Sequence, residues 1–444
     1  MSDKTAVSFI SLGCAKNQIN TEIMIAAVRN AGYEITGEPE KSKVCVINTC
    51  GFIEDAKKEA LETFFEVAQL KKEKKLEKII VCGCLAQRYE TEISDELYEA
   101  DGFVGVGSFS RIVEAVEKVL DGERVMFFDD LSNLQLEGER FVISPPFSTY
   151  LKIADGCSNR CSYCAIPIIR GDFHSRPIEN IVAEAKTLAE NGAKEIIVIA
   201  QDTTNYGIDI YGRRALPELL NKLCDVPGIE WIRIMYLYPD KITDELIDVI
   251  KNQNKIVKYI EMPIQHASGE ILRAMNRPGD SKTLLELVNR LRRNIPGVVL
   301  RTTVMVGFPG ETEQDFENLC VFLKKARFDK LGVFEFSPEI GTPAYVAQNQ
   351  IPDDIKAVRA ETIELLQSEI VLEKQLSLIG KTYTVMCEGF DRFAEYYYGR
   401  SYMEAPDIDG KIFFKSDDII CSGDMCSVRI TESMDFELIG EIVK

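Results

Sequence analysis

The chain has 444 residues, 45% of them hydrophobic and 28% charged, which is typical of globular domains and excludes a disordered or low-complexity chain. At roughly 150 residues per domain, this length favours about three domains. Acidic residues outnumber basic ones by 71 to 52, and the net charge of −19 argues against a broad electrostatic surface for nucleic acid. A basic protein partner suits such a chain better.

The sequence predicts a cytoplasmic protein without a membrane segment. It begins MSDKTAVSFI, with charges before a short apolar run, and no later apolar run approaches the ~20 residues that a bilayer requires. The cytoplasm keeps thiols reduced, so the thirteen cysteines do not suggest a disulfide scaffold. With only two histidines, His174 and His266, thiolate-bound iron is favoured over mixed-ligand zinc.

The first third of the chain alternates strand and helix patterns. Strands are predicted at residues 7–12, 43–48 and 79–81, and helices at residues 21–30, 54–70 and 108–120. This alternation predicts an open parallel sheet with crossover helices. An irregular, charged connection over residues 121–146 follows, so the first domain is predicted to span residues 1–146.

Each of the three predicted strands runs into a cysteine: SLGC ends at Cys14, INTC at Cys50 and VCGC at Cys84. Because the carboxyl ends of neighbouring parallel strands share one edge of a sheet, we expect these cysteines to converge. Cys45 and Cys82 lie within or directly after strands among apolar residues, so buried packing accounts for them.

A second strand-helix series predicts a complete or partial α/β barrel over residues 147–378. Its strands are predicted at residues 149–154, 195–200, 231–236, 258–262, 298–306 and 331–336. A long helix from about residue 353 to 378 ends this domain. Short strand patterns with Gly and Asp turns over residues 379–444 then predict a small β-barrel.

A CxxxCxxC loop of Cys157, Cys161 and Cys164 directly follows the first predicted barrel strand. Three thiolates cannot complete a four-thiolate cage, so a [4Fe–4S] cluster held here would keep one iron free for a small molecule. The three N-terminal cysteines likewise supply only three thiolates, so a [4Fe–4S] cluster held there would also keep one iron free. The alternatives are a zinc loop with its fourth ligand elsewhere, or three buried small side chains.

The CxxxCxxC loop, with Tyr163 before its last cysteine, resembles the radical S-adenosylmethionine superfamily. The segments SLGCAKN, NTCGF, CGCLAQRY, RGDFHSRP and AQDTTNYG resemble its methylthiotransferase family over essentially the whole chain. The resemblance implies an auxiliary [4Fe–4S] cluster on Cys14, Cys50 and Cys84, and an S-adenosylmethionine-binding [4Fe–4S] cluster on Cys157, Cys161 and Cys164. It also implies an electron-donor protein and a TRAM-like third domain that binds substrate.

Several other residues are candidates for binding roles, although no side chain is assigned a catalytic one. Gln201 and Asp202 end the second predicted barrel strand, where cofactor contacts are expected, and the alternative is a polar cap. Arg170 and Arg176 could bind a carboxylate of the cofactor or the substrate by paired hydrogen bonds, and the alternative is that they anchor a loop by salt bridges. Other residues considered are Gln265 and His266 near the barrel mouth, and Thr312 as a helix cap.

Members of the resembled family modify either adenosine in transfer RNA or an aspartate of ribosomal protein S12. The stretch Lys381–Lys444 carries 13 acidic and 7 basic residues, which suits a basic ribosomal protein better than phosphate. The segment GRSYMEAPDIDG at residues 399–410 and the SLGCAKN motif resemble the ribosomal-protein branch. We therefore expect methylthiolation of the aspartate β carbon. The Tyr396–Tyr398 cluster could favour RNA by base stacking, but because there is little basic charge around it, we expect it to pack in the barrel or at the protein interface.

Two further hypotheses remain from the residues alone. A non-catalytic iron–sulfur carrier explains six cysteines but not the barrel and the third domain, and cleavage of S-adenosylmethionine would distinguish it from an enzyme. A zinc-binding scaffold would lack the brown colour of iron–sulfur proteins.

Overall fold

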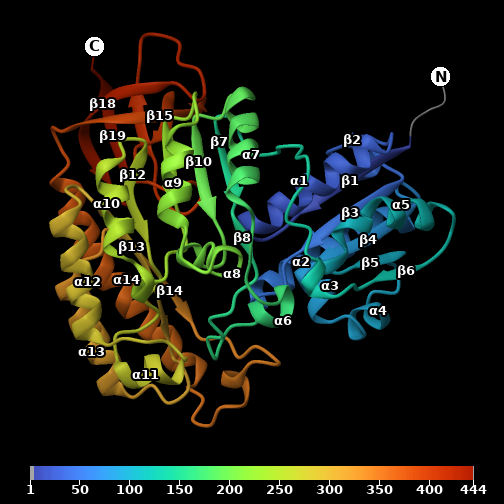
Figure 1. Ribbon diagram of the computed structural model, residues 1–444, viewed down its shortest axis with the longest axis horizontal. Helices are drawn as coiled ribbons and strands as arrows, with labels where there is room; N and C mark the ends of the chain where they lie inside the picture. The colour runs from blue at the N-terminus through green and yellow to red at the C-terminus, as the bar shows by residue number, and fades with distance from the viewer. Residues whose placement is uncertain (1–4, 444) are drawn as a thin grey trace.

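The computed structural model describes residues 5–443 and contains three parts (Figure 1). They are an N-terminal parallel sheet with helices, a central parallel sheet with helices, and a C-terminal closed β-barrel. The predicted α/β fold class is therefore confirmed. Residues 1–4 and 444 of the predicted first and third domains lie outside the described residues.

The N-terminal sheet has six parallel strands in the order β2-β1-β3-β4-β5-β6. Three of its strands have only three residues, too few for an apolar alternation to be recognised in the sequence. One of these, β6, lies in the segment 121–146 that was expected to be irregular, so that expectation was wrong there. The strands are β1 (Ala6–Ser11), β2 (Glu34–Thr36), β3 (Val44–Thr49), β4 (Lys78–Gly83), β5 (Gly102–Val104) and β6 (Val125–Phe127).

Helices cover both faces of this sheet, which is why its central strand β3 is buried throughout. The helices are α1 (Ala15–Asn30), α2 (Glu54–Lys72), α3 (Cys84–Arg88), α4 (Glu92–Glu96) and α5 (Ile112–Leu120). Helix α1 begins earlier than its periodicity predicted, directly after Cys14. This start places the cysteine at the N-terminus of the helix.

The central sheet has six parallel strands in the order β14-β13-β12-β11-β10-β7. Its two edge strands do not pair with each other, so it is a partial barrel, one of the two predicted forms. The strands are β7 (Ser148–Lys152), β10 (Glu195–Ile199), β11 (Trp231–Ile234), β12 (Ile256–Glu261), β13 (Val299–Val306) and β14 (Lys330–Glu335). A short antiparallel pair, β8 (Ala154–Asp155) and β9 (His174–Ser175), flanks the first strand.

The helices of this domain pack on the outer face of the sheet and form the largest apolar core with it (Figure 1). The long helix α14 (Asp353–Leu376) then leads to the third domain, as predicted. The remaining helices are α6 (Ile166–Arg170), α7 (Ile178–Glu190), α8 (Ile208–Tyr211), α9 (Leu216–Cys224), α10 (Asp244–Asn252), α11 (Gly269–Ala274), α12 (Ser281–Asn294) and α13 (Glu313–Ala326).

The inner face of the partial barrel is covered by the other two domains. Ile19 and Ile23 of α1 and Met403 of the C-terminal domain pack in one cluster with the inward-facing Ile197 and Ile199 of β10. All five are buried. The open sheet is thus closed by neighbouring domains rather than by its own strands, and water is excluded from this end of its interior.

A buried ion-pair network joins the C-terminal domain to the starts of the central strands. The carboxylate of Glu195 accepts hydrogen bonds from Arg233 at 2.9 Å and from Arg400 at 2.7 Å, and the three side chains are buried. Burial alone would raise the pKa of Glu195, but the two arginine charges hold it at about 2. This network fixes how the third domain docks.

The C-terminal domain is a closed barrel in the order β15-β16-β17-β19-β18. The strands are β15 (Thr382–Asp391), β16 (Tyr396–Arg400), β17 (Ile412–Lys415), β18 (Met425–Met434) and β19 (Glu437–Ile442). Strand β16 was not predicted and holds the tyrosine cluster considered for base stacking. Tyr397 stacks on Phe414 with ring centroids 5.9 Å apart, and thus packs against the barrel core.

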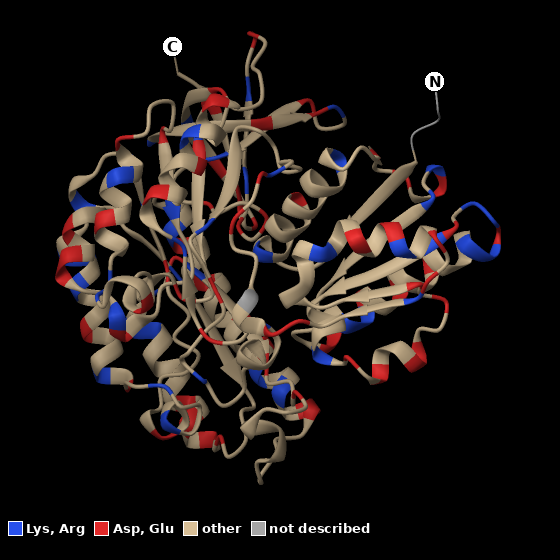
Figure 2. Cartoon of the chain, turned by 45° about the vertical axis from the view of Figure 1, so that its right-hand side comes forward, with Lys and Arg blue, Asp and Glu red and all other residues tan. Residues whose placement is uncertain are grey.

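Acidic and basic segments alternate along the outer helices in the view of Figure 2, without a continuous basic stripe. The lack of a continuous basic stripe in this view agrees with the net negative charge of the sequence. Among the described residues, no helix combines the length and apolar character needed to cross a bilayer.

Candidate functional site

The three N-terminal cysteines follow adjacent parallel strands. Cys14 follows β1, Cys50 follows β3, and Cys84 begins α3 directly after β4. Because β1, β3 and β4 are neighbours in the sheet, their carboxyl ends bring the three residues to one edge. Cys14 is exposed, Cys50 half-buried and Cys84 buried.

Two glycines allow these cysteines to approach one another. A Cβ atom on Gly13 would lie 2.6 Å from the Cβ of Cys50, and Gly13 has a φ of +86°. A Cβ on Gly51 would lie 2.7 Å from the Cα of Leu85, next to Cys84. No side chain fits in these places, so the glycines beside the cysteines permit close packing of the three loops.

The thiols of this group differ in their affinity for protons. Burial raises the pKa of Cys50 to about 11, and burial likewise raises the pKa of Cys84 although Arg170 opposes it. At Cys14, desolvation is outweighed by the charges of Lys16 and Arg170, which lower the pKa. Two cations therefore favour thiolate at this site, the form that binds metal.

The second cysteine group lies in the loop after β8, at the carboxyl end of the first central strand. The backbone N–H of Cys164 donates to the carbonyl of Cys161 at 3.0 Å, and that of Cys157 donates to Gly171 at 3.2 Å. A Cβ on Gly156 would lie 1.9 Å from the Asp172 carbonyl oxygen, so only glycine fits before Cys157. All three cysteines are half-buried.

Polar groups from two distant loops contact Cys161. The Tyr238 hydroxyl lies 3.5 Å from its sulfur, and Arg277 donates to the same sulfur at 3.8 Å. The Arg277 guanidinium also lies 4.0 Å from the centroid of the Tyr238 ring. Burial raises the pKa of Cys157 to about 11 and that of Cys164 to about 12.

Arg170 joins the two cysteine groups. One of its nitrogens donates to both oxygens of Asp155 at 3.1 and 2.9 Å, and the other donates to the sulfur of Cys84 at 3.4 Å. Asp155 precedes Cys157 by two residues. Arg170 and Asp155 are both buried. A single buried guanidinium thus connects the N-terminal cysteine site to the cysteine loop of the barrel.

Gln201 and Asp202 both reach the barrel cysteine loop. The Gln201 amide donates to Asp155 at 2.6 Å, and its buried Oε1 has no hydrogen-bond partner. Asp202 accepts from Asn159 and from Lys241, each at 2.8 Å. The unpartnered Gln201 oxygen leaves an acceptor available where a cofactor is expected.

Arg176 is engaged within the protein. Its guanidinium pairs with Glu137 and Glu184, each at 2.6 Å, and donates to the Lys152 carbonyl at 2.6 Å. These contacts match the loop-anchoring alternative rather than contact with a cofactor, because every donor nitrogen of this buried guanidinium has a partner in the chain.

The other candidates also have structural partners. His266 is fully buried and its Nδ1 accepts from the Ser268 backbone at 2.9 Å, while its Nε2 has no partner. Burial lowers the pKa of His266 to about 4. Thr312 caps α13 in a capping box with Asp315, which confirms that prediction.

Sequence reasoning missed three residues around the cysteine groups: Lys16, Asp155 and Arg277. Lys16 and Asp155 each lie two residues from a cysteine within recognised motifs, so their position was a usable signal. Arg277 carried no such signal, since it reaches Cys161 from a distant part of the chain.

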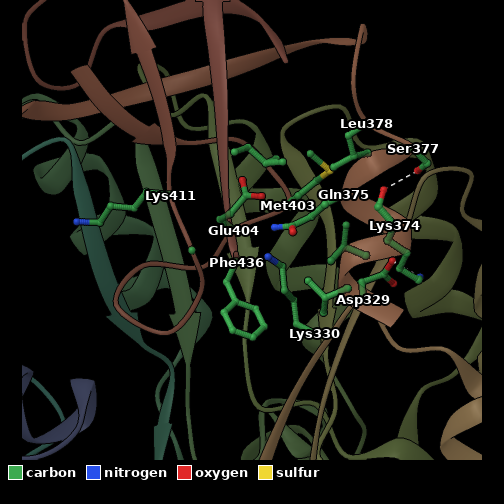
Figure 3. A pocket seen from close by; sticks show the side chains of 14 residues that line it. Asp329, Lys330, Lys374, Gln375, Ser377, Leu378, Met403, Glu404, Lys411 and Phe436 are labelled. Atoms are coloured by element: carbon green, nitrogen blue, oxygen red, sulfur yellow. Dashed lines mark hydrogen bonds and ion pairs between the residues drawn. The ribbon is translucent and has the colours of Figure 1, made fainter. Parts of the chain in front are cut away.

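A cavity of about 230 Å³ lies at the other end of the central sheet (Figure 3). It is lined by the first residues of β13 and β14, by α14, and by the C-terminal domain, including Lys330, Lys374 and Glu404. The cavity lies where the strands begin, whereas the cysteine loops follow the carboxyl ends of strands. The cavity is therefore separate from the cysteine groups.

The two cysteine groups fit iron–sulfur clusters. Among residues 5–443, no three His, Cys, Asp or Glu side chains converge closely enough to hold one metal ion. A single zinc ion requires that convergence, with thiolates at about 2.3 Å. A cubane binds each thiolate at a different corner and so spreads its ligands. Three thiols per group, glycine-lined approaches and nearby cations suit such a cluster.

Three family descriptions match successive parts of the chain. Residues 6–105 match the uncharacterized protein family UPF0004, residues 151–323 the radical SAM superfamily, and residues 379–443 the TRAM domain. The fold and the cysteine loop thus define a radical S-adenosylmethionine enzyme with an additional N-terminal domain and a TRAM domain.

Curated relatives cover nearly the whole chain. The ribosomal protein uS12 methylthiotransferase RimO of Lachnoclostridium phytofermentans is 46% identical over 98% of this chain and 99% of its own length. That of Caldanaerobacter subterraneus subsp. tengcongensis is 47% identical over the same shares. The chain belongs to the family of ribosomal protein uS12 methylthiotransferases, and it is a transferase. This confirms the resemblance found from the motifs.

Solved structures show the same fold at low identity. The radical S-adenosylmethionine methyltransferase TsrM of Kitasatospora setae has a TM-score of 0.58 at 14% identity and covers 78% of this chain and 77% of its own. The cobalamin-dependent S-adenosylmethionine radical enzyme OxsB has a TM-score of 0.51 at 12% identity, over 82% of this chain and 56% of its own. Membership in the family implies S-adenosylmethionine and [4Fe–4S] clusters as cofactors.

Proposed function

We propose that this protein is a radical S-adenosylmethionine methylthiotransferase that adds a methylthio group to the β carbon of an aspartate in ribosomal protein uS12. The observation that carries the proposal is the Arg170 bridge, which brings the Cys84 site and the Asp155–Cys157 loop to one domain interface. A substrate side chain at that interface can be reached from both sites. A carrier protein has no need of this arrangement.

The six cysteines have defined roles in this proposal. Cys14, Cys50 and Cys84 hold the auxiliary cluster, and Cys157, Cys161 and Cys164 hold the cluster that binds S-adenosylmethionine. When bound, these groups supply the one-electron chemistry and the sulfur and methyl groups that are transferred. The protein contributes positioning: Arg170 fixes the two loops relative to each other, and the packed inner face of the barrel excludes water.

We propose that Gln201 and Asp202 bind S-adenosylmethionine in the barrel. The unpartnered oxygen of Gln201 supports this proposal. We also propose an electron-donor protein as a second partner, and a cytoplasmic location, since uS12 and reduced thiols are found there. The acidic C-terminal domain suits the basic ribosomal protein.

The proposal is tested by anaerobic reconstitution of the protein with iron and sulfide. The reconstituted protein is incubated with S-adenosylmethionine, reductant, uS12 and transfer RNA, and both macromolecules are analysed by mass spectrometry. A methylthio group on uS12 is expected. Modification of transfer RNA alone would overturn the substrate, and the absence of 5′-deoxyadenosine would overturn the enzyme class.

Cysteine variants separate the two sites in this assay. Cys161→Ala is expected to abolish 5′-deoxyadenosine formation. Cys50→Ala is expected to retain it while losing sulfur transfer, because only the auxiliary site is changed. Cys421→Ala is the matched control, since this exposed cysteine lies in the C-terminal domain, and full activity is expected.

A further inference from the structure

Lys16 is a buried cation at the interface between the N-terminal domain and the barrel. It is the second residue of α1, two residues after Cys14, and its residue surface is 7% exposed. Its Nζ lies 3.2 Å from the centroid of the Tyr236 ring, just beyond the end of β11. The amine therefore extends from the auxiliary cysteine site to the mouth of the barrel.

This amine has no carboxylate partner among the described residues, and the anionic group beside it is the thiolate of Cys14. Among residues 5–443, no carboxylate lies within ion-pair distance of Lys16, and the Tyr236 ring is its cation–π partner. Lys152, the neighbouring buried lysine, shows the usual arrangement, because its Nζ donates to Asp155 at 2.9 Å and to Asn20 at 2.6 Å. Buried lysines in proteins are normally paired with carboxylates, so the Lys16 amine is suited to bind a carboxylate that the chain does not supply.

The acidic side chain whose charge acts on Lys16 is that of Glu261, and it accepts a hydrogen bond from another group. Glu261, at the end of β12, accepts the backbone N–H of Tyr236 at 2.5 Å. Tyr236 has a φ of +62°, a left-handed conformation that a tyrosine adopts only when its surroundings impose it. The fold thus holds the Tyr236 ring against the lysine instead of giving the lysine a carboxylate.

We propose that Lys16 is the specificity-determining residue that binds the side-chain carboxylate of the substrate aspartate. The inference rests on the proposed function. The β carbon of an aspartate is bonded to its carboxylate carbon, so a cation that holds the carboxylate also places the β carbon. Lys16 is suited to this task because it lies between the auxiliary cysteine site and the barrel, where the reacting carbon must be.

The test measures binding of two peptides to the anaerobically reconstituted protein with S-adenosylmethionine and no reductant. The peptides carry the modified uS12 loop with either Asp or Asn at the modified position, and fluorescence anisotropy gives the Kd of each. Wild type is expected to bind the Asp peptide about 10-fold or more tightly than the Asn peptide, as for a charge-assisted hydrogen bond. Lys16→Met is expected to bind both alike.

Lys41→Met is the matched control, because Lys41 is an exposed lysine of the same domain. It is expected to keep the full preference for the Asp peptide. A second readout is the stability of the protein without peptide. Lys16→Met is expected to leave the urea midpoint unchanged or raised, because it removes a buried charge that has no carboxylate partner, and a lowered midpoint would indicate a structural ion pair instead.

The outcomes distinguish this inference from the proposed function. Retention of the Asp preference in Lys16→Met overturns the inference, as does a change confined to the reduction potential of the auxiliary cluster. If the wild type modifies uS12 in the mass-spectrometric assay, the proposed function is supported even when one of these two results overturns the inference about Lys16. If the wild type binds neither peptide and modifies only transfer RNA, the proposed function fails and the inference fails with it.

Discussion

Arg170 donates a hydrogen bond to the sulfur of Cys84 at 3.4 Å although the two residues belong to different domains. The same guanidinium holds both oxygens of Asp155. Burial alone would raise the pKa of Asp155, but Arg170 and Lys152 hold it well below its usual range. One buried cation therefore joins the two domains directly between the two cysteine groups.

Replacing Arg170 by Met is expected to lower the free energy of unfolding by about 3–5 kcal/mol, because the buried Asp155 loses its arginine partner. The measurement is urea unfolding of the cluster-free protein. Arg160→Met is the matched control, since the Arg160–Asp172 pair is well exposed and contributes about 0–1 kcal/mol. Equal losses in the two variants would contradict the role given to Arg170.

Gly13→Ala is expected to reduce the iron content of the reconstituted protein to about half, because the new Cβ would collide with Cys50 at the auxiliary site. Iron and sulfide analysis checks this, and 5′-deoxyadenosine formation should persist. Gly32→Ala shares the positive φ, but nothing lies within 4 Å of its Cβ. It is expected to keep all of its iron, and a similar loss there would point to backbone strain alone.

Glu195→Gln is expected to destabilise the protein by about 3–5 kcal/mol at pH 7, because two buried arginines lose their carboxylate. The folded pKa of about 2 lies below the ordinary 4.5, so this contribution is present above pH 4.5 and lost as the pH falls toward 2. Urea unfolding at several pH values should show the difference between wild type and variant shrinking over that window. Glu441→Gln, in an exposed pair with Arg429, should change stability little at any pH.

The contribution of Glu311 to stability is expected to depend on pH in the opposite direction to that of Glu195. Burial raises its pKa to about 7, even though Arg359 and the backbone N–H groups of Gly307 and Phe308 oppose the shift. The contribution of Glu311 to the free energy of unfolding is therefore present below pH 4.5 and lost as the pH rises through 7. Glu311→Gln should gain stability relative to wild type, by roughly 1–3 kcal/mol, between pH 5 and 8.

The control for this experiment is Glu313→Gln. Glu313 pairs with the same arginine but is mostly exposed, so its stability difference from wild type should change by less than about 1 kcal/mol over this pH range. Circular dichroism in urea gives both series. A flat difference for Glu311→Gln would show that its carboxyl group is not protonated near neutral pH in the folded protein.

Much of the fold could be predicted from local patterns of apolar residues in the sequence. The six central strands were predicted to within two residues at each end, since long buried strands produce apolar runs that helices interrupt. Strands β2, β5 and β6 were missed because three residues carry too little pattern. Strand β16 was missed because its sequence, YYYGR, shows no alternation of apolar and polar residues.

The sequence by itself determined the chemistry available to this protein. Cysteines after strand ends, with glycines beside them and a CxxxCxxC loop, specify thiolate sites because their spacing and their position after strand-like runs are local properties. Only the tertiary structure decided which cations serve these sites. Arg170 was a candidate for binding a cofactor or substrate carboxylate, but it pairs with Asp155 and contacts Cys84. Arg176 anchors a loop, and Lys16 lies against an aromatic ring. A buried charge takes whichever partner the packing of distant segments supplies, and periodicity along the chain does not encode that choice.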